Sequence, residues 1–250
     1  KLSERELARF LFPLVLSSIF QQLYAPVGAA AAGRFLNQEA VAVIGACSAW
    51  DLILDALFIS MTTGFAISIN RAAGMGKEKR LRETVQGAVL LSAVMTAGSF
   101  LLAVFPDPFM VLANIPPQMR EESREYLRFL LLGGGFQGLQ NLLICLIQGS
   151  GESRFPAIVT VGAVIAQTGL SLVLLGQLHM GVEGVSLAVL FSQMGSVLLL
   201  SAHYLKGRWG IPLLIPFKGG NPLIWRGLAA SGMAKVLMTF LANAGAFVLQ

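Results

Sequence analysis

The chain has 250 residues, of which 55% are hydrophobic and only 12% are charged, and its mean hydropathy is +0.72. Because an average soluble domain has about 25% charged residues, this composition excludes an ordinary soluble globular protein. The net charge of +5 does not indicate nucleic-acid binding, since Lys and Arg gather in the cytoplasmic loops of membrane proteins.

Seven apolar runs are long enough to cross a bilayer, which takes about 20 apolar residues per helix. They predict an all-α membrane protein with short connections and no room for a separate soluble domain. In chain order the expected spans are Ala8 to Ala32, Ala40 to Ala73, Thr84 to Phe105, Tyr126 to Ile147, Pro156 to Leu178, Val182 to Leu205 and Gly227 to Gln250.

Two basic connections stand out between these spans. The cluster from Lys77 to Arg82 follows the second span, and we expect it to form a loop. The segment from Lys206 to Arg226 mixes basic residues with Trp209, Phe217 and Trp225, a pattern typical of chain that lies on a membrane surface. We therefore expect this segment to be a cytoplasmic interfacial linker.

The distribution of Lys and Arg between alternate connections predicts the orientation in the membrane. One side holds only Arg34, Arg120, Arg124 and Arg128, and Lys235 lies inside a span, whereas all the other Lys and Arg residues fall on the opposite side. Since the basic side is normally cytoplasmic, we expect the amino terminus to be cytoplasmic in a multi-pass protein of the cell's inner (plasma) membrane.

Asp51 and Asp55 are the most informative residues within the predicted spans. They lie four positions apart and so share one helical face. Intramembrane carboxylates are costly and usually face a water-filled cavity or a partner. Two on one face also repel each other when ionised, which favours proton uptake. The alternative is that both lie near the outer interface, where water solvates them.

A few other polar residues at membrane depth complete the candidate substrate and ion pathway. Lys235 either pairs with Asp51 or Asp55, attracts an anionic substrate, or extends toward the cytoplasm. The amides are either interhelical hydrogen-bonding groups or part of a cavity wall. The amides at membrane depth are Gln137, Gln140, Asn141, Gln167 and Asn243, of which all but Gln137 are assigned to the candidate pathway.

Three stretches resemble the MATE (multidrug and toxic compound extrusion) transporters, whose superfamily also holds lipid-linked oligosaccharide flippases. The first runs from Gln21 to Tyr24 and continues through Gly33 to Ala46. The second, Gly149 to Arg154, is similar to the family's Gly-x-Gly-[Asp/Glu]-x-Arg loop, and the third is Gly181 to Gln193. The order and spacing of the three carry the resemblance, which covers essentially the whole chain.

The resemblance implies half of a twelve-helix transporter. Residues 1–205 would form an amino-terminal six-helix lobe, 206–226 a linker, and 227–250 the incomplete first helix of a second lobe. The expected partners are the bilayer, a small-molecule substrate and the remaining carboxy-terminal lobe of the same chain. Rocking of one lobe against the other would give alternating access.

The ion site that many MATE proteins hold in this lobe is not matched here. The positions that would carry its acids and polar groups are occupied by Gly28, Gln167, Ser171 and Val189. None of these side chains can titrate, so we predict that they form no ion site.

The leading functional hypothesis is a secondary transporter that exports organic compounds, cationic ones among them, in exchange for H⁺ or Na⁺. The alternative is a flippase-like transporter of a lipid-linked or amphipathic substrate, which a basic cavity would favour. A non-transporting scaffold stays open. We expect no enzyme and no cofactor: Asp51 and Asp55 share one helix without the Gly-x-Gly-Asp motif of intramembrane aspartyl enzymes, and no ATP-binding glycine loop occurs.

Overall fold

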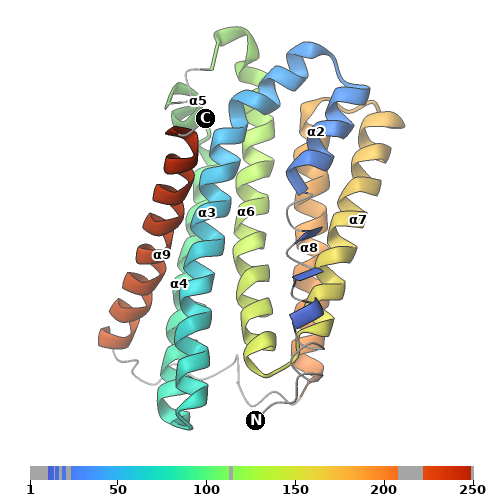
Figure 1. Ribbon diagram of the computed structural model, residues 1–250. Coiled ribbons are helices and arrows are strands. Elements are labelled where there is room, and N and C mark those ends of the chain that lie inside the picture. Colours follow the sequence, from blue (N-terminus) through green and yellow to red (C-terminus); the bar gives the residue numbers. More distant parts are fainter. Residues whose placement is uncertain are drawn as a thin grey trace.

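The computed structural model of the chain is a bundle of long helices that run alternately up and down (Figure 1). It describes residues 11–13, 15–16, 19–20, 24–112, 115–207 and 222–248, without the side chains of 24–29, 48–49, 240 and 242–248. The described elements are α2 (Tyr24–Phe35), α3 (Gln38–Gly74), α4 (Glu78–Val104), α5 (Asp107–Leu112), the 3₁₀ helix η1 (Pro117–Met119), α6 (Arg120–Gly149), α7 (Arg154–Gly176), α8 (Val182–Lys206) and α9 (Pro222–Val248).

Five helices among the described residues are long and apolar enough to cross a membrane: α3, α4, α6 together with η1, α7 and α8. They coincide with the second to sixth predicted spans, and α9 coincides with the seventh. The first predicted span is described only in part, as short pieces up to residue 20 and as α2 from Tyr24 onward. The prediction of an all-α, multi-pass membrane fold is confirmed.

Two predicted boundaries were wrong. The cluster from Lys77 to Arg82 is not a loop, because α4 already begins at Glu78. An acidic residue is favourable in the first helical turn, and Glu78 also lies 3.5 Å from Arg82 one turn later. The seventh helix begins at Pro222 and not at Gly227, since proline is well suited to a first helical turn.

Helix α6 lies at the centre of the bundle, packed against α3, α4 and α8. Its glycines make this possible: a Cβ at Gly138 would lie 2.6 Å from the Phe58 ring of α3, and one at Gly135 would lie 2.5 Å from the Phe100 ring of α4. Ser99 of α4 also donates a hydrogen bond to the carbonyl of Leu131. These two glycines therefore serve helix packing.

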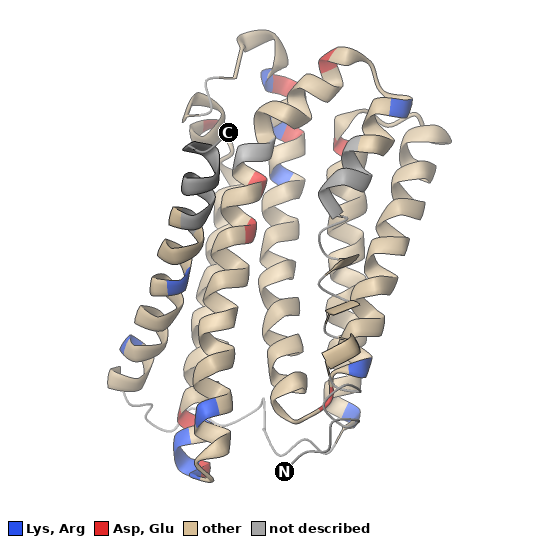
Figure 2. Ribbon diagram, viewed as in Figure 1, with Lys and Arg blue, Asp and Glu red and all other residues tan. Residues whose placement is uncertain are grey.

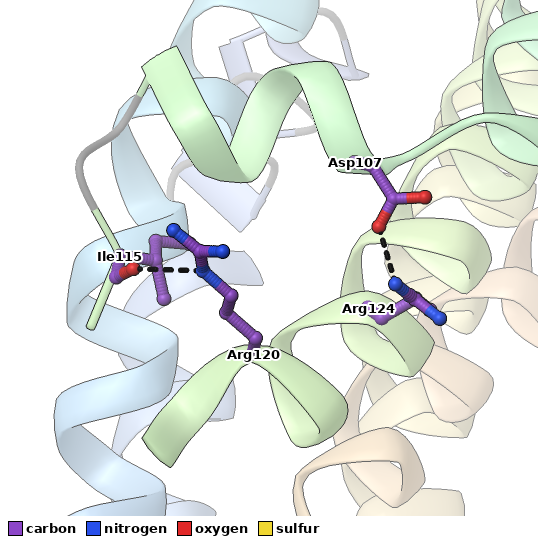
Figure 3. A network of polar contacts seen from close by, with 4 residues as sticks. All are labelled: Asp107, Ile115, Arg120 and Arg124. Atoms are coloured by element: carbon purple, nitrogen blue, oxygen red, sulfur yellow. Dashed lines mark hydrogen bonds and ion pairs between the residues drawn. The ribbon is translucent and has the colours of Figure 1, made fainter. Parts of the chain in front are cut away.

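The connection between α4 and α6 is a folded cap and not an open loop. Arg124 donates to the Asp107 carboxylate at 2.5 Å, and the Arg120 Nε donates to the Ile115 carbonyl at 3.4 Å (Figure 3). This cap lies at the opposite end of the bundle from the turn between α3 and α4 (Figure 1).

Basic residues gather at the end of the bundle that carries the turn between α3 and α4. Figure 2 shows Lys and Arg at that turn, at the start of α7 and at the end of α8. The fold thus brings together the described part of the group that the sequence assigned to one side of the membrane.

Candidate functional site

A cavity of about 340 Å³ lies between α3, α6, α7 and α8. Most of its wall is apolar, with Leu54 and Ile59 from α3 and Val185 and Val189 from α8. Against this background two groups of polar side chains line the cavity, a pair of carboxylates on α3 and a set of amides on α6, α7 and α8. The site is therefore a mostly apolar cavity with a few polar side chains in its wall.

The carboxylate group consists of Asp51 and Asp55, which line the cavity together because they lie one helical turn apart. The amide Nε2 of Gln137 on α6 donates a hydrogen bond to Asp55 Oδ1 at 2.8 Å. Neither acid takes part in any of the ion pairs found among the described residues. Among the described residues, no basic side chain therefore pairs with either carboxylate.

The amide group comes from three helices. Gln140 and Asn141 lie on α6, Gln167 on α7 and Gln193 on α8, and all four line the cavity. The exposed fraction is 4% for Gln140, 2% for Gln167 and 5% for Gln193. Each of the four leaves one amide oxygen or nitrogen buried without a hydrogen-bond partner.

Five of the residues that the sequence singled out come together here: Asp51, Asp55, Gln140, Asn141 and Gln167 all line the cavity. They come from positions far apart in the chain. Their roles in function stay a prediction, but their convergence on one chamber is a structural fact.

Lys235 does not line the cavity, and no ion pair joins it to Asp51 or Asp55 among the described residues. The reason is that α9 packs against another face of α3. Ser60 lies 3.0 Å from Thr239 in a hydrogen bond, and a Cβ at Gly64 would meet the backbone of Gly232. At about 100° per residue, Ser60 and Gly64 lie on the far side of α3 from the two acids.

Asn243 was also predicted in the pathway, but its side chain lies outside the described residues. The surroundings of Gly28 are likewise not described. Trp225, expected in the interfacial linker, instead belongs to α9 and packs beside Gly87 of α4.

The sequence analysis left two cavity residues out of the pathway, Gln137 and Gln193. A signal for each was present. Gln137 lies three and four positions before Gln140 and Asn141, hence on the same helical face. Gln193 follows Val185 and Val189 at the same four-residue spacing, but nothing in the sequence says that this face of α8 points to the acids.

Three of the four positions that match the family's ion site, those of Gln167, Ser171 and Val189, lie within the described side chains. Gln167 and Val189 line the cavity, and Ser171 is completely buried with an unpartnered hydroxyl. The sequence of α7, from Arg154 to Gly176, contains no acidic residue. The described acids of the chamber all come from α3.

Comparisons with known proteins agree on one family. The sequence model of the MatE family matches residues 13–173. A relative named "Probable multidrug resistance protein YoeA", from Bacillus subtilis, is 25% identical over 207 residues, covering 81% of this chain and 45% of its own length. One named "Probable multidrug resistance protein NorM", from Thermotoga maritima, is 26% identical over 197 residues, covering 76% and 42%.

Solved structures show the same fold. A crystal structure of a MATE protein in the bent conformation superposes with a TM-score of 0.86 at 17% identity, covering 98% of this chain and 55% of that one. An outward-facing multidrug resistance MATE transporter gives a TM-score of 0.84 at 18% identity, covering 97% and 54%. The chain spans less than half the length of the curated relatives it matches.

Proposed function

The chain belongs to the MatE family, and from this we propose that it is part of a secondary transporter that exports organic compounds, cationic ones among them, in exchange for H⁺ or Na⁺. The relatives named as multidrug resistance proteins support an efflux function. The observation that carries the proposal is the cavity with its two carboxylates, Asp51 and Asp55, neither of them ion-paired among the described residues.

The chemistry of the chamber suits a drug-sized organic cation. Its volume of about 340 Å³ lies in the range typical of small-molecule sites, roughly 300 to 1,000 Å³. Apolar side chains such as Leu54 and Val189 offer contact area for a hydrophobic body. The carboxylates supply the negative charge, and partial removal from water strengthens their attraction for a cation.

The same two carboxylates give a physical basis for exchange. When Asp51 and Asp55 are ionised, the chamber carries negative charge and binds a cation. When they are protonated, this attraction disappears and the substrate is released. A proton and a cationic substrate thus compete for one pair of groups, which is the requirement for antiport. Sodium could compete in the same way, since carboxylate oxygens coordinate it.

The flippase alternative is not favoured by the described wall of the cavity. An anionic lipid-linked substrate would need basic residues there, whereas the charged side chains that line the chamber are Asp51 and Asp55. Lys235, the basic residue that the sequence offered for this role, packs elsewhere with α9.

The test is transport by the full-length protein in vesicles with an imposed proton gradient, with methyltriphenylphosphonium as the probe. Asp51→Asn combined with Asp55→Asn should abolish pH-dependent transport while leaving expression and folding intact. Glu122→Gln, which changes an exposed acid in the first turn of α6, is the matched control and should transport normally. Normal transport by the double variant across about pH 5.5 to 8 would contradict the proposal.

A further inference from the structure

The unpartnered amides of the cavity require an occupant. A buried polar atom left without a hydrogen bond is costly, and native proteins avoid this or satisfy the atom with ordered water or another polar molecule. Here four such atoms converge on one chamber, from Gln140, Asn141, Gln167 and Gln193. Three of these side chains are at least nine-tenths buried.

The chemistry of these groups defines what they recognise. An amide offers both a donor and an acceptor and carries no charge. Here the unpartnered atoms are the carbonyl oxygens of Gln140, Gln167 and Gln193, which accept, and the amide nitrogen of Asn141, which donates. The matching guest group therefore donates more than one hydrogen bond and accepts one, as a primary amide or a urea does. A purely apolar guest would leave all four amide atoms unsatisfied. A formal charge would find its counterpart at the carboxylates on α3 and not among the amides.

We propose that the amides of Gln140, Asn141, Gln167 and Gln193 form a hydrogen-bonding subsite for a neutral polar group on the transported cation. This inference rests on the proposed function and narrows the substrate class. The preferred substrate has a cationic end for Asp51 and Asp55, an apolar body, and a primary amide or urea group for the walls formed by α6, α7 and α8.

The experiment compares two probes that differ only in such a group: methyltriphenylphosphonium and (carbamoylmethyl)triphenylphosphonium. Both carry one positive charge and the same three phenyl rings. Binding to the purified full-length protein is measured by calorimetry. The carbamoyl probe should bind about tenfold more tightly, the ratio for one net hydrogen bond of about 1.4 kcal/mol.

Gln→Met substitutions remove the amides at nearly constant shape. Gln167→Met and Gln193→Met, each made singly, should bring the carbamoyl probe down to the affinity of the methyl probe. Folding of the variants is checked separately by thermal unfolding, and their melting temperatures should match that of the unchanged protein. Gln118→Met in η1, at an exposed position of the cap between α4 and α6, is the matched control and should keep the full preference.

The outcomes separate this inference from the proposed function. If both probes bind the unchanged protein equally, the amide subsite is wrong while cation binding stands. If the preference survives both Gln→Met substitutions, the polar group is recognised elsewhere and the inference is again wrong. If neither probe binds, the proposed function fails, and the inference fails with it.

Discussion

The hydrogen bond from Gln137 makes the two cavity acids unequal. Gln137 donates to Asp55 at 2.8 Å, whereas no hydrogen bond to Asp51 from another described residue is found. A donated hydrogen bond stabilises the ionised form of a carboxylate. The amide thus gives Asp55 a partner that Asp51 lacks among the described residues, and it links α3 to α6 at the level of the two acids.

Removing this donor should change the pH dependence of transport. In Gln137→Leu the ionised form of Asp55 loses stabilisation, so protonation occurs at a lower proton concentration. The midpoint of the transport profile should therefore move to higher pH by roughly one unit, which corresponds to one hydrogen bond to a charged group. Vesicle transport measured against pH checks this, with Gln118→Leu as control, and an unchanged or acid-shifted midpoint would contradict it.

The ion dependence of transport should not depend on Gln167. Its side chain cannot titrate and supplies no carboxylate to sodium, so Gln167→Ala should leave the response to proton and sodium gradients unchanged for the methyl probe. The measurement is uptake under each gradient separately. Loss of either response on this substitution alone would show that neutral residues still coordinate the coupling ion.

At the scale of single residues, spacing revealed the acids better than their partners. Asp51 and Asp55 were identifiable because a charge inside an apolar run is rare and four residues make one turn. Gln193 was not, because its relation to the acids depends on how α8 faces α3, which is a matter of tertiary packing. The expected pairing of Lys235 failed for the same reason, since the sequence does not say which face of α3 receives α9.

Among the helices, α3 has the most demanding position, because it serves two neighbours with opposite faces. One face carries the acids into the cavity, and the other carries Ser60 and Gly64 against α9. With 37 residues it is about 55 Å long, well beyond the roughly 30 Å of hydrocarbon. At 1.5 Å per residue, Asp51 and Asp55 lie about 20 to 25 Å from the first residue of α3.

The contact between α3 and α9 should not tolerate even one added methyl group. A Cβ at Gly64 would lie 2.7 Å from the Cα of Gly232, and backbone atoms cannot move aside as a flexible side chain does. We expect Gly64→Ala to destabilise the protein by about 1–3 kcal/mol through overpacking.

Thermal unfolding of the purified full-length variant measures this effect. Gly98→Ala in α4 is the matched control, because a Cβ there meets nothing within 4 Å and should leave the melting temperature unchanged or slightly raised. Equal melting temperatures for Gly64→Ala and the unchanged protein would show that α9 is not held at this distance.

The long helices were predictable because hydropathy alone determines where a chain crosses lipid. Their ends were less so. The start of α4 at Glu78 depends on local charge, and the cap formed by α5 and η1 depends on Arg124 and Arg120, which contact Asp107 and Ile115 across the connection. Such contacts have no periodic signature in the sequence.

At the scale of the whole molecule, the gathering of basic residues at one end argues for an orientation in the membrane. We propose that this end, with the turn between α3 and α4, is cytoplasmic. The cap between α4 and α6, at the opposite end of the bundle, would then face away from the cytoplasm. The amino terminus would then be cytoplasmic as well.

Single cysteines test this orientation in a background that lacks Cys47 and Cys145. Lys79→Cys near the start of α4 should react only with a membrane-permeant reagent in intact cells, whereas Gln118→Cys in η1 should also react with an impermeant one. Reaction of both with the impermeant reagent would contradict the assignment.

The contact between Gly64 and Gly232 has a mechanical consequence. The two backbones touch there, with the Met61 side chain of α3 packed against Gly232, so the crossing of α3 and α9 can serve as a pivot. Gly232 divides α9 into arms of about 15 Å toward Pro222 and about 24 Å toward Val248. When a helix tilts about such a point, its two ends move in opposite directions. A single small rotation about this point would then move the Pro222 end of α9 toward α3 while the Val248 end moves away from it.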